Sequence, residues 1–207
     1  MAGPGRPRRF DETHERQLLL DASLAVMERN GFDDVSVADI LAEADVSTRS
    51  FYCHFASKDE LVCAIYRREA ERAAERIGES TKAAATPIEA LDNWLAGMLS
   101  IGHHQRKAKR AVILSSPGAM RAEGYGESVR YALDMLAVPL RETINAGLER
   151  GDFAYGSDED IELIQFMVWA AAGMAPGRSV RPSFDQVFDT VRSFVHRTLG
   201  VQLATIA

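Results

Sequence analysis

Apolar residues recur every three or four positions along most of this 207-residue chain, which is the period of an amphipathic helix. Glycine, proline, or a serine or threonine that can cap a new helix interrupts this repeat at intervals. The pattern therefore predicts an all-α protein of about nine helices, without strands. The helices are expected at residues 12–30, 37–44, 48–54, 58–78, 87–103, 105–115, 127–150, 158–174 and 183–199.

The segment from Ser36 to Phe55 combines two short predicted helices with a tight turn between them. In the first helix, apolar residues fall at i, i+3, i+4 and i+7 from Val37. The second can bury Phe51 and Phe55, four positions apart, while its other side chains face away. Those side chains include hydroxyls, a guanidinium, a phenol and an imidazole, which suit contacts with bases and phosphates in a DNA major groove. The segment therefore predicts a helix-turn-helix.

The stretch SVADILAEADVSTRSFYCHFASKDEL resembles the DNA-binding signature of the tetracycline-repressor-like (TetR) family, through FYCHF and the SKDEL that follows. The resemblance covers about the first quarter of the chain closely and the helical remainder in general plan. One position departs from it: Asp45 stands in the turn where the family commonly has glycine. Aspartate tolerates a left-handed backbone, so the turn can survive. The resemblance implies a DNA-binding domain with a basic arm at 1–56 and a ligand-binding and dimerisation domain at 57–207.

Candidate DNA contacts come from the second short helix and from its flanks. The N-terminal GRPRR resembles arms that lie in a DNA minor groove, where arginine is drawn to the negative potential, although a solvated tail would have the same composition. Lys58 matches the family's phosphate-contact position, and its alternative is a plain surface lysine. The candidate DNA-binding residues are Arg6, Arg8, Arg9, Ser36, Ser47, Thr48, Arg49, Ser50, Tyr52, His54 and Lys58.

The net charge of −6 argues against a protein that coats nucleic acid indiscriminately. Basic residues without acids gather in two short stretches, 1–10 and 46–58. We therefore expect a small basic footprint on an acidic protein, with few phosphate contacts and a modest dependence of DNA affinity on salt.

The middle helices are expected to surround an apolar pocket for a small molecule. Aromatic and methionine side chains with a few hydroxyls are typical of such sites, although helical spacing alone also predicts ordinary core packing. The basic run at 103–110 is either a solvated face or an attraction for an anionic ligand such as an acyl thioester. The candidate ligand-binding residues are Trp94, Met98, Ile101, Ile113, Met120, Tyr125, Tyr131, Met135, Phe166 and Trp169.

The last two predicted helices are unusually apolar. The helix at 158–174 is apolar nearly all round, and the one at 183–199 has a broad apolar face. The TetR-like family pairs its last two large helices with those of a second copy, and these residues fit that plan; a core helix pair in a monomer is the alternative. Two recognition helices related by a two-fold axis would read a palindromic operator.

No catalytic pattern is complete in the sequence. His14-Glu15 would need a histidine at position 18 to make a zinc motif, but Leu18 stands there. The two cysteines lack metal-ligand spacing, and no run of about 18 apolar residues could span a membrane. We expect a cytoplasmic protein that is not an enzyme and needs no metal or cofactor.

The best-supported hypothesis is a homodimeric, ligand-responsive transcriptional regulator. It would act as a repressor on a palindromic double-stranded DNA operator and be released by a small, largely apolar effector. The alternative is an all-helical small-molecule carrier or interaction module that keeps the hairpin of helices only for packing.

Overall fold

The computed structural model describes residues 12–174 and 182–201, and within these ranges it contains ten α-helices, one π-helical segment and no strand. The predicted all-α class is confirmed. None of the described helices is long and apolar enough to cross a membrane. The elements are α1 (Glu12–Asn30), α2 (Val37–Ala44), α3 (Thr48–His54), α4 (Lys58–Lys82), α5 (Pro87–His103), α6 (Gln105–Leu114), α7 (Pro117–Met120), α8 (Tyr125–Arg150), α9 (Asp158–Trp169), η1 (Ala170–Met174) and α10 (Phe184–Thr198).

Six of the described helices start where the capping residues of the sequence place them. The hydroxyls of Ser36, Ser47 and Ser57 each accept a hydrogen bond from the backbone N–H three residues later. Thr86, Ser157 and the Ser183 hydroxyl do the same for α5, α9 and α10. Each bond satisfies one of the backbone donors left free in the first turn of a helix, so the helix starts follow from local chemistry.

Two elements differ in kind from the prediction, and α4 continues past the expected end at residue 78 to Lys82. A single-turn helix, α7, begins at Pro117, where the sequence was expected to form a loop, because the Ser116 hydroxyl accepts from the N–H of Ala119. The helix expected at 158–174 ends its α-helical part at Trp169 and continues as η1, in which Gly173 has a φ of 84°. The π-helical segment lies next to the cavity described below.

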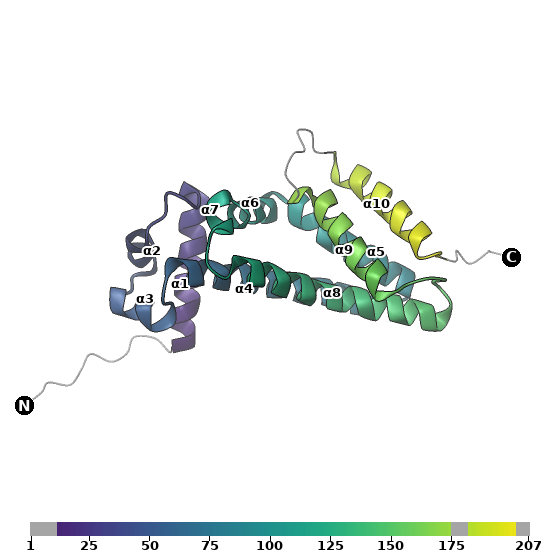
Figure 1. Cartoon of the computed structure of the whole chain (residues 1–207), viewed down its shortest axis with the longest axis horizontal. Coiled ribbons are helices and arrows are strands. Elements are labelled where there is room, and N and C mark those ends of the chain that lie inside the picture. The colour runs from purple at the N-terminus through teal and green to yellow at the C-terminus, as the bar shows by residue number, and fades with distance from the viewer. Residues whose placement is uncertain (1–11, 175–181, 202–207) are drawn as a thin grey trace, which may run out of the picture.

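The described chain is elongated (Figure 1). Helices α1, α2 and α3 form one end, and α5, α9 and α10 gather towards the other. The long helices α4 and α8 pack along each other and connect the two ends, while α6 and α7 lie above them near α1.

Buried apolar side chains form two clusters. The first joins α1–α3 to the start of α4 through Leu61, Val62 and Ile65, and it also takes in residues of α6, α7 and α8. The second contains the apolar faces of α5, α8, α9 and α10. The first cluster thus extends past residue 56, so α1–α3 depend on the helices that follow for much of their packing.

A polar clip holds α10 against α5. Arg192 Nε donates to Asp92 Oδ2 at 2.8 Å, and His196 Nε2 lies 2.7 Å from Asp92 Oδ1. Burial raises the pKa of the Asp92 carboxyl, but the bonds from His196 and Arg192 outweigh it and hold that pKa below its ordinary value. The carboxylate is therefore charged at neutral pH and fixes the position of the last helix.

Candidate functional site

The turn between α2 and α3 has the geometry that the sequence predicts. Ser36 and Asp39 form a reciprocal capping box at the start of α2. At its end, Asp45 takes up the left-handed backbone, with φ 51° and ψ 44°, and its N–H donates to the carbonyl of Leu41. Aspartate therefore serves in the place of glycine, and the chain turns directly into the cap of α3.

Helix α3 buries one aromatic side and exposes another. Phe51 and Phe55 are fully buried with ring centroids 5.9 Å apart, as predicted. Tyr52 is 59% exposed, and Thr48 and Arg49 are also exposed at the start of the helix. A phenol, a hydroxyl and a guanidinium thus share the outer side of a seven-residue helix.

Two predicted DNA-contact residues of α3 face their own protein instead. The hydroxyl of Ser50 is buried and has no hydrogen-bond partner among the described residues. His54 Nε2 lies 3.1 Å from Glu15 Oε2 of α1, and its side chain is only 10% exposed. Neither group is presented to a partner molecule in this conformation. The arm residues Arg6, Arg8 and Arg9 lie outside the described residues.

Lys58 anchors the connection between α1 and α2. Its Nζ donates to the carbonyls of Val35 at 2.5 Å and Phe32 at 3.3 Å, and it lies 4.7 Å from the centroid of the Phe32 ring. An ammonium group has three donors, so one N–H is left for a phosphate. Lys58 is therefore a structural residue as well as a candidate DNA contact.

Replacing Lys58 with methionine keeps the apolar stem but removes both hydrogen bonds and the cation–π contact. We expect the free energy of unfolding to fall by roughly 1.5–3 kcal/mol, the range for hydrogen bonds to a charged group. Urea denaturation followed by circular dichroism would measure it, with Lys82→Met at the exposed end of α4 as the control. A variant as stable as the wild type would contradict the anchoring role.

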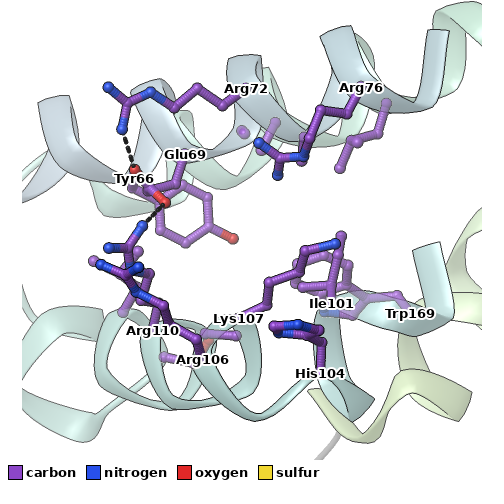
Figure 2. Close-up of a pocket in the computed structure, with 17 residues that line it drawn as sticks. Tyr66, Glu69, Arg72, Arg76, Ile101, His104, Arg106, Lys107, Arg110 and Trp169 are labelled. Carbon is purple, nitrogen blue, oxygen red and sulfur yellow. Dashed lines mark hydrogen bonds and ion pairs between the residues drawn. The ribbon is translucent and has the colours of Figure 1, made fainter. Parts of the chain in front are cut away.

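A cavity of about 500 Å³ lies between α4 and α6 and reaches α8 and Trp169 (Figure 2). Of the ten predicted ligand-binding residues, only Ile101 and Trp169 line it. Polar side chains of α4 line one side of the cavity, and part of the basic run lines the other side from α6. The prediction did not include these residues in its pocket. The charged lining residues are Glu69, Arg72, Arg76, Arg106, Lys107 and Arg110, and Tyr66, His104 and Ser115 add further polar groups.

The other predicted ligand-binding residues are dispersed. Trp94 and Met98 are buried in the second cluster, where Trp94 Nε1 donates to the carbonyl of Leu136. Met120 and Phe166 are more than half exposed. Ile113 is buried in the first cluster, and Met135 packs against the second. The Tyr125 ring contacts that of Tyr66, and the Tyr131 hydroxyl donates to Glu71.

Ion pairs link the cavity to α1. Arg110 Nε donates to Glu28 Oε1 of α1 at 2.5 Å, and its Nη1 donates to Glu69 Oε2 of α4 at 3.0 Å. Burial lowers the pKa of Arg110, but the bond to Glu28 and the charge of Glu69 outweigh it and raise that pKa overall. One guanidinium on α6 therefore holds α1 and α4 together at the edge of the cavity.

The described residues contain no group of three or more histidine, cysteine or acidic side chains that could hold a metal ion. Two features of the sequence indicate the charged lining. One is the basic run of α6, and the other is the three- and four-residue spacing of Glu69, Arg72 and Arg76, which places them on one face of α4.

The N-terminal helices match the sequence profile of the bacterial regulatory proteins of the tetR family over residues 19–65. The transcriptional repressor KstR of Mycolicibacterium smegmatis is 30% identical over 89 residues, which make up 43% of this chain and 43% of that repressor. The match thus spans less than half the length of this curated relative.

Solved structures share the fold over most of the chain. A TetR transcription regulator from Haloarcula marismortui superposes with a TM-score of 0.73 at 18% identity, over 92% of this chain and 100% of that one. FadR from Bacillus subtilis, in complex with stearoyl-CoA, superposes with a TM-score of 0.67 at 17% identity, over 86% and 96%. Residues 19–65 therefore belong to the tetR family of bacterial regulatory proteins, and the chain shares the fold of these solved structures over most of its length.

Proposed function

We propose that this protein is a ligand-responsive, DNA-binding transcriptional regulator that acts as a repressor on a palindromic operator. The observation that carries the proposal is the outer side of α3, where Thr48, Arg49 and Tyr52 are exposed while Phe51 and Phe55 hold the helix to the core. A helix kept only for packing would have no need of this set. In the proposed complex, Arg49 bonds to a guanine edge, and the hydroxyl groups contact bases or phosphates.

We propose the division of labour that the sequence predicts, with residues 1–56 reading DNA and residues 57–207 binding the effector and a second copy. Exposed apolar side chains on the last helices support the dimer. Leu163 and Phe166 of α9 are 67% and 51% exposed, and Phe194 of α10 is 48% exposed. A second copy packed against α9 and α10 would cover them and present two recognition helices to the operator.

In this proposal the cavity between α4 and α6 is the effector site. A ligand there touches α4, which leads out of the DNA-reading end, and α6, whose Arg110 is paired with α1. A ligand that prefers one arrangement of these helices shifts the population between DNA-bound and free states. FadR, a structural neighbour with this fold, is in complex with stearoyl-CoA.

Fluorescence anisotropy with a labelled fragment from upstream of the protein's own gene tests the DNA-binding role. Arg49→Ala is expected to weaken sequence-specific binding by about 1–3 kcal/mol and to relax the preference at one base position, because it removes a base-edge contact. Lys109→Ala, which removes one exposed positive charge from α6, is the matched control and should leave affinity and preference unchanged.

Two results would contradict the proposal. One is equal binding of specific and scrambled fragments by the wild type. The other is the same loss of affinity in both variants, which would reduce the role of Arg49 to net charge. A protein that binds small molecules in the cavity but no specific DNA would instead be a carrier or interaction module.

A further inference from the structure

We propose that the cavity between α4 and α6 selects an amphipathic anion, with a carboxylate or phosphate held by Arg76 and Lys107 and an apolar chain or ring against the apolar side chains that line the rest of the cavity. The inference rests on the proposed function only in taking this cavity as the effector site. It replaces the largely apolar effector of the sequence prediction with a charged one.

The first argument is a surplus of positive charge. Glu69 is the one acidic residue among those that line the cavity, and it is already paired with Arg72 at 3.1 Å and with Arg110 at 3.0 Å. Within the described residues, Arg76 and Arg106 form no ion pair. The side chains of Arg76 and Lys107 extend towards each other from opposite helices (Figure 2). Arg76 and Lys107 therefore face the space without a carboxylate of their own and form its charged rim, and the exposed Arg106 adds a third positive charge beside Arg110.

The second argument is the environment of Lys107. Its Nζ donates to the hydroxyl of Ser100 at 3.1 Å, which is a neutral partner. Partial burial and the nearby charge of Arg76 both lower the pKa of its ammonium group. Like charges held close in a partly buried site are unfavourable, and an anion placed between them would turn the repulsion into two attractions.

The third argument is the apolar part of the lining. Ile101, Leu136 and Trp169 line the cavity, and Tyr66 and Ala73 add apolar surface from α4. Burial raises the pKa of the Tyr66 phenol far above its ordinary value, so the ring presents a neutral hydroxyl. The volume of about 500 Å³ is in the range of small-molecule sites. A cavity lined by both unpaired cations and apolar side chains is complementary to a molecule with one charged end.

Isothermal titration of the full-length protein with decanoate, decyl phosphate and decanol tests the ligand class. These probes share one apolar chain and differ in the head group, so the two anions also separate a carboxylate from a phosphate site. We expect at least one anion to bind roughly tenfold or more tightly than decanol, because charge-assisted hydrogen bonds supply the difference.

The variant Arg76→Met/Lys107→Met removes two rim charges and keeps the apolar stems. Its control, Lys82→Met/Lys109→Met, removes two charges from the same helices outside the cavity. We expect the rim variant to lose roughly tenfold or more in affinity for the anion and to bind decanol as the wild type does, while the control keeps both affinities. Thermal melting of each variant checks that it is folded.

The inference would be overturned if decanol bound as tightly as both anions, if neither anion bound, or if the control lost as much affinity as the rim variant. DNA binding is measured separately. A protein that binds its operator but not these anions keeps the proposed function and loses this ligand class. A protein that binds an anion at the rim but no specific DNA keeps this ligand class and loses the proposed function.

Discussion

Phe51→Ala is expected to abolish specific DNA binding by detaching α3 from the protein. The Phe51 ring is fully buried, with its centroid 5.9 Å from that of Phe55 and 5.3 Å from that of Tyr52. A helix of seven residues is not stable in water without tertiary packing. Truncating a buried phenylalanine costs roughly 3–5 kcal/mol, a large part of the total stability of a small domain. Urea denaturation and DNA anisotropy would measure the two losses.

Tyr52→Ala, at the neighbouring position, separates packing from recognition. Tyr52 is exposed and meets Phe51 only edge to face, so its removal should cost at most about 1.5 kcal/mol of stability. Operator affinity should nevertheless fall, because the phenol belongs to the proposed contact surface. If Phe51→Ala bound DNA normally, α3 would not be the recognition helix; if Tyr52→Ala bound normally, the phenol would not be a contact.

The helices could be predicted from the sequence because their signals are local. A serine at position 36, 47 or 57 caps the backbone N–H three residues later, and both partners are visible in a short window. The departure at Asp45 was also predictable, since the left-handed turn is a property of one residue. The outward and inward sides of α3 followed from the spacing of Phe51 and Phe55.

The cavity could not be predicted in the same way. Helical spacing says that Trp94 and Met98 face inward, but the neighbours that fill the space around them lie on α8 and later helices. Arg72 and Arg76 lie in a stretch of alternating charges that is typical of solvated helices. They line a cavity only because α6, about 30 residues later in the chain, carries its own cations to the opposite side.

The contacts of His54 and Lys58 could not be predicted from the sequence for the same reason. His54 ends α3 and Lys58 begins α4, and a polar residue so close to the proposed recognition helix favours a DNA contact when the sequence is considered alone. Their partners are Glu15 in one case and the carbonyls of Phe32 and Val35 in the other, all distant in sequence. Whether a polar side chain faces DNA or its own protein depends on tertiary partners that no local pattern contains.

Gly102→Ala is expected to disrupt the contact between α5 and η1 and to reduce ligand binding with it. A Cβ at position 102 would lie 1.6 Å from the carbonyl oxygen of Ala172 and 2.7 Å from its carbonyl carbon. These are backbone atoms, so no side-chain rotation can relieve the clash, and helix and π-helical segment must move apart. The cost should be roughly 3 kcal/mol or more, at or above the upper end for overpacked cores. Ile101 and Trp169 lie beside this contact and line the cavity.

Gly78→Ala in α4 is the matched control, because a Cβ there meets no atom within 4 Å. Alanine in a helix interior is more favourable than glycine by about 0.5–1 kcal/mol, so this variant should be slightly more stable than the wild type. The two substitutions add the same methyl group to helices of one protein and should change the unfolding midpoint in opposite directions. If Gly102→Ala is as stable as the wild type and binds decanoate as well, α5 and η1 can separate without consequence, and the cavity does not depend on their close approach.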